Sequence, residues 1–378
     1  MLTAGVTIDP FASQVARDGQ GEVPWWRTQL GQEEIDAVAS AIRSEQISMG
    51  SVTEQFEQEV SQAFDVPYVV ATTSGTSALL MAMMALEVGP GDEVIVPART
   101  FIATAHAAAV VGAKIVLADC RDDRPVVDVA EIERKLSART KVVVPVHLNG
   151  RACAMDEITA LAQARGIAVV EDAAQAAFSR LGERYLGTLG DLGCFSLGMT
   201  KLIASGQGGI VVTRRKALYD KLRRIRANGV DSVINHRYVS KGLNFKVSDL
   251  LAAIALCQLR RAQASADHCA EIQASYARGL ARLPFIDLLP FDAAAGERGP
   301  WAEAVSPQRD ALIDFLAQRG IQTRRFVPSL NSAEHLACGD SYPNAERFGA
   351  TGLILPCGPA QALANVERVV AALEGFCG

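Results

Sequence analysis

The sequence predicts an α/β protein in which helices cover a largely parallel sheet and a smaller α+β unit follows at the C-terminal end. Short runs of β-branched residues alternate with helical stretches between Tyr68 and Val170. The strand runs are almost continuously apolar, which is typical of strands buried on both faces. At 378 residues the chain is long enough for two domains. Ligands of such sheets bind beyond the carboxyl ends of the strands, so functional residues are expected there.

The elements are predicted from apolar periodicity and from turn residues. Two helices come first, at 32–43 and 53–64. The alternating region has strands at 68–71, 93–97, 114–117, 141–146 and 167–170, and helices at 77–86, 102–111, 129–136 and 155–165. A strand at 210–212 and helices at 214–227 and 248–276 follow. The C-terminal unit has strands at 285–289, 301–305, 321–327 and 352–355, and helices at 308–319 and 361–376. We therefore divide the chain into an N-terminal arm (1–24), a large domain (25–275) and a small domain (276–378).

Composition excludes several classes of function. The net charge of −5 provides no basic face for nucleic acid. The eight cysteines form no Cys-x-x-Cys pair, which favours reduced thiols in a cytoplasmic protein, and the histidines lack zinc-ligand spacing. No apolar run is long enough to span a membrane, and the N-terminus lacks a basic segment followed by an apolar core.

Lys201 is the first candidate catalytic residue. It stands among small and apolar residues, between Phe195 and the glycine-rich turn at 205–209. A partly desolvated lysine amine has a lowered pKa and can attack carbonyl carbon. The alternative is an ordinary surface lysine in a loop.

The second candidate feature is the run Thr72–Ser77, which follows a strand and opens a helix. Free amides at a helix N-terminus bind anions, and the hydroxyls of Ser74 and Thr76 add donors for a phosphate. Simple helix capping explains the same residues. The run has neither a Walker lysine nor a Gly-x-Gly-x-x-Gly pattern.

Two further strand ends carry polar or aromatic residues. Glu171 and Asp172 end a strand, and because adjacent residues face opposite ways only one carboxylate can enter a site. A buried Asp172 would keep a heteroaromatic nitrogen protonated, and Gln175 lies within reach of a ring hydroxyl. Phe101 follows another strand, where it could stack on a flat ligand or pack in the core.

A phosphate site, a stacking ring, a carboxylate for a ring nitrogen and a Schiff-base lysine together specify pyridoxal 5′-phosphate (PLP). The order of these features resembles the fold-type I PLP enzymes, and more narrowly the DegT-type family of sugar aminotransferases. The resemblance covers nearly the whole chain. It rests on segments 74–79, 100–104, 147–151, 170–176, 190–196, 206–209, 242–246 and 355–356, and on Lys201.

The resemblance implies a role for each matching residue. Lys201 would form the Schiff base with PLP, and Asp172 would pair with the pyridine nitrogen. Gln175 would meet the ring hydroxyl, and Phe101 would stack on the ring.

It also implies how the phosphate is held. Gly75, Thr76 and Ser196 would bind it within one subunit, and Asn244 would reach the phosphate of the neighbouring subunit's cofactor. The active unit would then be a homodimer with shared sites.

The implied activity is transfer of an amino group from an amino acid, glutamate or glutamine in this family, to a nucleotide-linked keto-sugar or a related cyclitol by a ping-pong mechanism. Some members carry His in place of the lysine and remove a hydroxyl, whereas this chain has Lys201. The alternatives are a PLP-dependent dehydratase or eliminase acting on a sugar, a PLP-binding regulatory protein, and a sugar-binding module without PLP.

The chain departs from the family pattern near the substrate. Gln207 stands where the family has Glu, Lys246 replaces a bidentate Arg, and the segment 197–200 lacks the usual proline. Substrate contacts are expected from His147, Tyr185 and Arg324. The wider segments that carry this expectation are 147–151, 235–238 and 324–326.

Overall fold

The computed structural model describes residues 21–231, 237–336 and 339–376. Its centre is a seven-stranded sheet in the order β1-β9-β8-β5-β4-β2-β3. The strands are β1 (Tyr68–Thr72), β2 (Glu93–Pro97), β3 (Lys114–Ala118), β4 (Thr140–Val143), β5 (Ala168–Asp172), β8 (Leu192–Ser196) and β9 (Gly209–Thr213). Neighbours are parallel from β8 to β3, and only β9 runs antiparallel to both of its partners. The predicted, mostly parallel α/β fold is confirmed.

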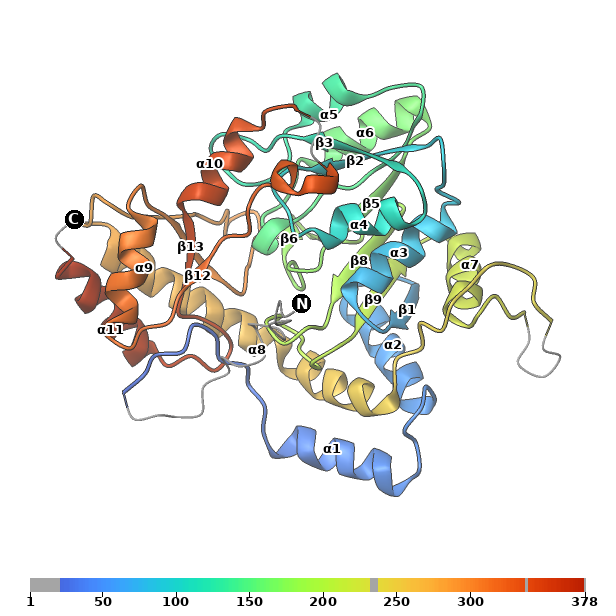
Figure 1. Cartoon of the computed structure of the whole chain (residues 1–378). Helices are drawn as coiled ribbons and strands as arrows, with labels where there is room; N and C mark the ends of the chain where they lie inside the picture. The colour runs from blue at the N-terminus through green and yellow to red at the C-terminus, as the bar shows by residue number, and fades with distance from the viewer. Residues whose placement is uncertain (1–20, 232–236, 337–338, 377–378) are drawn as a thin grey trace, which may run out of the picture.

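The helices of this region connect the strands and cover both faces of the sheet (Figure 1). They are α1 (Gln32–Arg43), α2 (Ser51–Ala63), α3 (Gly75–Ala85), α4 (Ala103–Val110), α5 (Val129–Lys135), α6 (Met155–Arg165), α7 (Lys216–Arg226) and α8 (Asp249–Leu280). A short 3₁₀ turn, η2 (Leu148–Gly150), and a small hairpin of β6 (Arg180–Leu181) and β7 (Arg184–Tyr185) lie after β4 and β5.

The core follows the alternation of strand side chains. Val70, Val94 and Val170 face one side, where they pack with α3, α4 and α7. Ile95 and Val169, which are their neighbours in the chain, face the other side and pack with α5 and α6. On that side of the sheet, α2 and α8 cover the strands β1, β8 and β9. Both faces are therefore buried, which explains the continuous apolar strands.

The C-terminal unit is a four-stranded antiparallel sheet in the order β10-β11-β13-β12. Its elements are β10 (Asp287–Leu288), β11 (Ala302–Val305), α9 (Arg309–Ala317), β12 (Arg324–Arg325), η3 (Leu330–Ser332), η4 (Glu334–Leu336), α10 (Pro343–Thr351), β13 (Gly352–Leu355) and α11 (Leu363–Glu374). In Figure 1, α8 runs from beneath the large sheet into this unit. The helix continues unbroken past residue 275, where the sequence placed the boundary, so that division stays a prediction.

The first described residues correct the predicted extent of the N-terminal arm. Val23 is fully buried and pairs with Ile321, and Trp26 pairs with Cys357. Residues 23–24 therefore belong to the body of the protein, against the C-terminal unit. Residues 1–20 lie outside the described structure.

Two of the longer elements, β8 and α10, were not predicted. The strand β8 contains no β-branched residue, but it pairs along its two edges with β5 and β9. The helix α10 contains a proline and two residues of low helix propensity, but Asp119 at the end of β3 accepts hydrogen bonds from the amides of Asn344 and Ala345 at its first turn. A residue distant in the sequence therefore supplies the cap.

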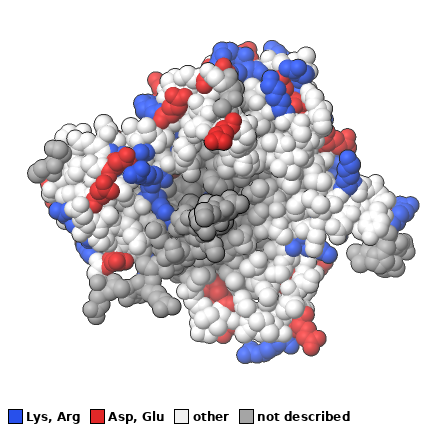
Figure 2. Space-filling model, viewed as in Figure 1, with Lys and Arg blue, Asp and Glu red and all other residues white. Residues whose placement is uncertain are grey.

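On the face shown in Figure 2, acidic and basic side chains are interspersed and lie mainly toward the outline of the molecule. That face presents no broad patch of a single charge. Among the described helices, none is long and apolar enough to cross a membrane.

Asp249 joins the beginnings of α2 and α8. The side chain is fully buried and accepts hydrogen bonds from the amides of Gly50, Val52 and Thr53 at 2.8, 3.2 and 3.1 Å. The hydroxyl of Thr53 donates to the same carboxylate at 2.6 Å. One carboxylate thus satisfies the free amides of a helix that lies about two hundred residues earlier in the chain.

We expect Asp249→Ala to lower the free energy of unfolding by about 2–4 kcal/mol, because the α2 amides would be left buried without acceptors. Urea unfolding followed by circular dichroism measures this change. Asp156→Ala, at an exposed carboxylate, is the control and should change stability by less than about 0.5 kcal/mol. Equal effects of the two substitutions would contradict the capping role.

Candidate active site

The carboxyl end of β5 carries two acidic residues that face opposite sides of the sheet. Asp172 accepts a hydrogen bond from the Thr104 hydroxyl of α4 at 2.8 Å and another from the amide of Ala174 at 3.1 Å. Burial raises the pKa of Asp172, and these two hydrogen bonds oppose the rise. Glu171 lies on the other side and accepts hydrogen bonds from the amides of residues 187, 189 and 190. Only Asp172 is therefore directed to the α4 side of the sheet.

Lys201 lies in a loop that is closed at its base. The amide of Leu197 donates to Gly208 O, and the amide of Ser205 donates to Leu197 O, each at 2.9 Å. Gly208 has φ +138°, and a Cβ there would meet the Leu197 side chain at 3.0 Å. Glycine is required at this position by both the backbone conformation and the close approach.

Residues far from Lys201 in the sequence donate hydrogen bonds to the carbonyl oxygens of this loop. The indole Nε1 of Trp26 and the hydroxyl of Thr28 donate to Met199 O at 3.0 and 2.9 Å. The indole Nε1 of Trp301 donates to Thr200 O at 3.1 Å. The backbone on the N-terminal side of Lys201 is thus fixed by hydrogen bonds to two successive carbonyls.

The amine of Lys201 is enclosed even though the residue as a whole is only half-buried. Its Nζ lies 4.9 Å from the centre of the Trp301 ring. Burial lowers the pKa of Lys201 to about 8, and the negative charge of Asp172 partly opposes this fall. About a tenth of the amine is therefore unprotonated and nucleophilic at pH 7, far more than for an ordinary lysine.

The N-terminus of α3 has the free amides that an anion site requires. Ser74 caps the helix, since its Oγ accepts the amide of Ser77 at 3.0 Å, while the amides of Gly75 and Thr76 precede the first intrahelical hydrogen bonds. A Cβ on Gly75 would lie 2.8 Å from Cβ of Ser196, so only glycine allows Ser196 to lie this close. Ser196 Oγ accepts the Gly198 amide at 3.3 Å, which leaves its own proton free to donate. The run at 72–77 thus caps the helix and also presents an anion site.

Gln175 is oriented by the turn η2. Its Oε1 accepts the amide of Asn149 at 2.8 Å, which leaves the amide nitrogen of the side chain available. Asn149 has φ +50°, and its side chain hydrogen-bonds the backbone nitrogen and oxygen of Trp301 at 3.1 and 2.9 Å. Asn149 therefore connects Gln175 with the residue that packs on Lys201.

Phe101 is at the start of α4 and is 52% exposed, so it is not a core residue. Its carbonyl oxygen lies 3.0 Å from the hydroxyl of Thr104, which donates its proton to Asp172 and accepts one from Thr100. The Phe101 backbone is thus held near the residues that bind Asp172, while the ring keeps an open surface.

The structure corrects the expectation that His147 contacts a substrate. His147 is fully buried, and its Nε2 pairs with Glu171 at 2.8 Å. Its Nδ1 accepts the amide of Cys153 at 3.2 Å, so both nitrogens are engaged. His147 positions the β5 end from the face opposite Asp172.

The remaining predicted residues are not brought to Lys201 by any contact among the described residues. Tyr185 packs on Phe64, and its hydroxyl interacts with Arg180 at 2.5 Å. The guanidinium carbon of Arg324 lies 5.1 Å from the centre of the Trp25 ring. Asn244 is exposed. The predicted residues 235 and 236 lie outside the described structure.

Sequence reasoning missed Thr104, Asn149, Trp26 and Trp301 as parts of the site. Trp26 and Trp301 are two of only three tryptophans in the chain, which was the available signal. Thr104 and Asn149 look like ordinary helix and turn residues, so only the fold reveals their contacts.

The assembled groups match one kind of ligand. The α3 terminus fits an anionic group, Phe101 offers a face for a flat ring, Asp172 suits a protonated ring nitrogen, and Lys201 suits a carbonyl carbon. Gly75 and Ser196 leave room that a larger residue would fill.

Comparison with known proteins gives a consistent result. Residues 28–374 match the sequence model of the DegT/DnrJ/EryC1/StrS aminotransferase family. A GDP-perosamine synthase of Caulobacter vibrioides is 34% identical over 337 residues, which cover 86% of this chain and 90% of that protein. A GDP-perosamine synthase of Escherichia coli O157:H7 is 30% identical over 360 residues, which cover 94% and 98%. The crystal structure of DesV from S. venezuelae, in complex with a ketimine intermediate, superposes with a TM-score of 0.88 at 31% identity and covers 93% of this chain and 97% of that one.

The lowered pKa of Lys201 predicts a distinctive reactivity of the cofactor-free protein. The rate at which a small aldehyde and borohydride label Lys201 should rise about tenfold between pH 7 and pH 9 and then level off. Lys216, on the exposed surface of α7, is the reference lysine, and its profile should differ from that of Lys201. Peptide mass spectrometry measures both residues in one digest.

Asp172→Asn provides the matched variant. Asp172 stabilises the ammonium form of Lys201. Its loss should therefore lower the pH at which the labelling rate of Lys201 levels off, and leave the labelling of Lys216 unchanged. If Lys201 and Lys216 show parallel profiles in the wild type, the amine is not desolvated.

Proposed function

Because this chain belongs to the DegT/DnrJ/EryC1/StrS aminotransferase family, we propose that it transfers an amino group from an amino acid to a keto-sugar carried on a nucleotide. The observation that carries the proposal is the enclosed amine of Lys201 with Asp172 as its charged neighbour. Two relatives are named GDP-perosamine synthases, which supports a nucleotide-linked sugar as the acceptor. We take glutamate or glutamine as the donor.

We propose PLP as the cofactor. Gly75, Thr76 and Ser196 would hold its phosphate at the α3 terminus, and Phe101 would cover the ring. Asp172 would pair with the pyridine nitrogen, and Gln175 would donate to the ring hydroxyl. When bound, PLP supplies a carbonyl for Schiff-base formation and an electron sink that stabilises negative charge at the donor's α-carbon.

Each remaining task in the reaction is assigned to particular residues of the chain. Lys201 in its neutral form acts as the nucleophile and, once displaced by the donor, as the base that moves a proton. Thr104 and the amide of Ala174 hold the Asp172 carboxylate, which keeps the ring nitrogen protonated. Trp301 and Trp26 hold the loop so that the amine stays at the sheet edge.

Each substrate would use the same site in turn, so the reaction is expected to follow ping-pong kinetics. The amino acid would give up its amino group and leave as a keto acid. The keto-sugar would then receive that group and leave aminated.

We propose that the active unit is a homodimer with shared sites. Asn244 is exposed and has no contact with the site of its own chain among the described residues, which is what a residue serving a second subunit requires. Four large apolar side chains on or beside α1 are more than half exposed, and so is that of Leu243. These four are Leu30, Ile35, Ile42 and Ile47. A second copy would bury such surface.

We also propose a cytoplasmic location. The six cysteines in the described residues are all free thiols, and five of them are buried. This usage fits a reducing compartment.

The function is tested by the two half-reactions. Adding L-glutamate or L-glutamine to the PLP-loaded protein should convert the near-visible absorbance of the bound cofactor to that of the amine form. A keto-sugar nucleotide from a panel that includes free keto-sugars and inososes should restore it. Lys201→Ala should slow both steps by at least about a thousandfold. If no donor changes the absorbance, the protein is not an aminotransferase.

Shared sites are tested by mixing two inactive variants. Lys201→Ala and Asn244→Ala should each be impaired alone. After dissociation and reassociation, the mixture should recover about a quarter of wild-type activity, because half of the dimers are mixed and each mixed dimer has one complete site. No recovery by a mixture shown to be dimeric would place Asn244 in its own subunit's site.

A further inference from the structure

Arg99 is a buried cation that the proposed reaction does not use. It follows β2 and is only 3% exposed. Its Nη1 donates to Val327 O at 2.9 Å, and its guanidinium carbon lies 4.5 Å from the centre of the Phe326 ring. Among the described residues, Nε and Nη2 have no hydrogen-bond acceptor. The edge formed by these two nitrogens is the one that binds carboxylate or phosphate with two parallel hydrogen bonds.

The charges around Arg99 do not balance. The carboxylate that acts most on Arg99 is that of Glu303, which is 2% exposed and is already paired directly with Arg151. Arg151 is fully buried and also donates to Leu289 O and Pro290 O. One carboxylate thus serves two buried guanidinium groups. Burial lowers the pKa of Arg99, and the charge of Glu303 opposes this fall.

Arg99 is adjacent in the chain to a residue of the Lys201 site. Thr100, which follows it, hydrogen-bonds Thr104 at 3.0 Å, and Thr104 donates to Asp172. On the side of the C-terminal unit, Glu303 lies in β11, the strand that begins directly after Trp301. Arg99 therefore lies between two segments that each contain or adjoin a residue of the site.

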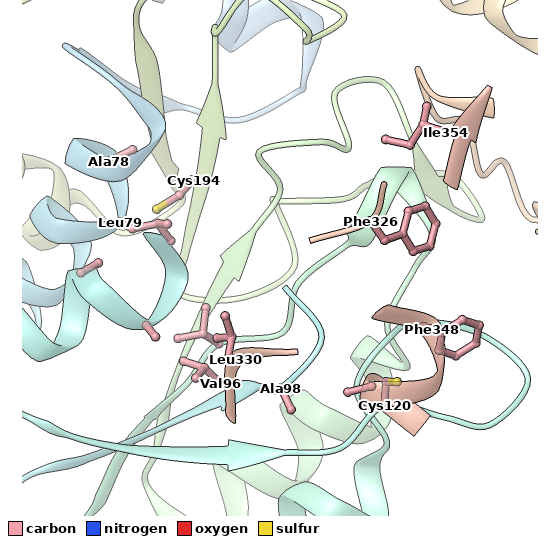
Figure 3. Close-up of a cluster of buried hydrophobic side chains, with 14 of the residues drawn as sticks. Ala78, Leu79, Val96, Ala98, Cys120, Cys194, Phe326, Leu330, Phe348 and Ile354 are labelled. Carbon is pink, nitrogen blue, oxygen red and sulfur yellow. The ribbon is translucent and has the colours of Figure 1, made fainter. Parts of the chain in front are cut away.

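The C-terminal unit encloses this position. Leu330 lies against Val96 and Ala98 at the end of β2, with Phe326 on the adjoining segment (Figure 3). The amide of Leu330 donates to Ala98 O at 2.9 Å. Arg99 thus lies in the interface between the sheet edge and the small unit.

We propose that the Nε–Nη2 edge of Arg99 binds an oxyanion of a substrate, either the carboxylate of the amino donor or a phosphate of the sugar carrier. An oxyanion there would accept two parallel hydrogen bonds and neutralise the excess positive charge beside Glu303. This inference rests on the proposed function and deepens it, because it assigns a substrate-recognition residue to the same site.

The first experiment measures oxyanion binding without turnover. Glutarate, which has no amino group to transfer, and inorganic pyrophosphate are added separately to the PLP-loaded protein, in which the cofactor phosphate site is filled. At least one of them should raise the thermal midpoint of the wild type and leave that of Arg99→Met unchanged. Arg134→Met, at an exposed arginine, is the matched control and should respond as the wild type does.

The second experiment identifies the source of the oxyanion. Half-saturating concentrations are measured for L-glutamate in the donor half-reaction and for the keto-sugar nucleotide in the acceptor half-reaction. Arg99→Met should raise one of them about tenfold to a hundredfold. A rise for the donor assigns a carboxylate, and a rise for the acceptor assigns a phosphate. Arg99→Lys should show a smaller rise, because it keeps the charge but loses the paired donors.

The stability of the ligand-free protein separates binding from a structural role. Arg99→Met removes an uncompensated buried charge and should not lower the thermal midpoint, whereas a structural cation would. Unchanged half-saturating concentrations and thermal shifts in both Arg99 variants would overturn the proposal. If Arg99→Met does not fold, a structural role is favoured. In that case, thermal shifts of Arg99→Lys with glutarate and pyrophosphate that equal those of the wild type would overturn the proposal of oxyanion binding. Failure of the wild type to react with any donor would instead reject the proposed function.

Discussion

Enclosure of the Lys201 amine opposite Asp172 is the constraint on which the rest of the site depends. An amine in water would stay protonated at neutral pH, and a carboxylate in water could not hold a ring nitrogen in its protonated form. Both groups therefore have to be desolvated while they remain near each other. Asp172 lies at the end of a strand of the sheet, and Lys201 lies in the closed loop at 197–208. Neither element could achieve this arrangement alone.

Buried charges also join the large sheet to the rest of the chain. Asp249 caps α2 from the start of α8, Asp119 caps α10 from the end of β3, and Glu303 pairs with Arg151 across the junction with the C-terminal unit. Each contact satisfies groups that would otherwise be buried without partners, so it fixes geometry more than it adds stability. The sheet edge is consequently held against the small unit at several points.

The sequence predicted the mostly parallel sheet and six of its seven strands, because these follow from periodicity. Chemistry at strand ends singled out Lys201, Asp172 and the α3 terminus as candidates, and their roles stay proposals. The sequence could not predict α10, whose cap comes from Asp119, or the role of Trp301, whose contacts cross a hundred residues. It was wrong about His147, because a histidine in a turn gives no sign that Glu171 and Cys153 will use both of its nitrogens. Local patterns identified the chemical groups, while long-range contacts decided their roles.

The two hydrogen bonds that hold the Lys201 loop have a consequence for biosynthesis. Trp26 belongs to the first described segment and Trp301 to the C-terminal unit, and they bind successive carbonyls of one loop. A ribosome that has completed β9 has already made Lys201, but the indole that encloses its amine is still about ninety residues from being synthesised. Enclosure of the amine by this indole therefore depends on a residue that is made late in synthesis. The lowered pKa of Lys201 is consequently a property of the assembled protein and not of the loop that contains it.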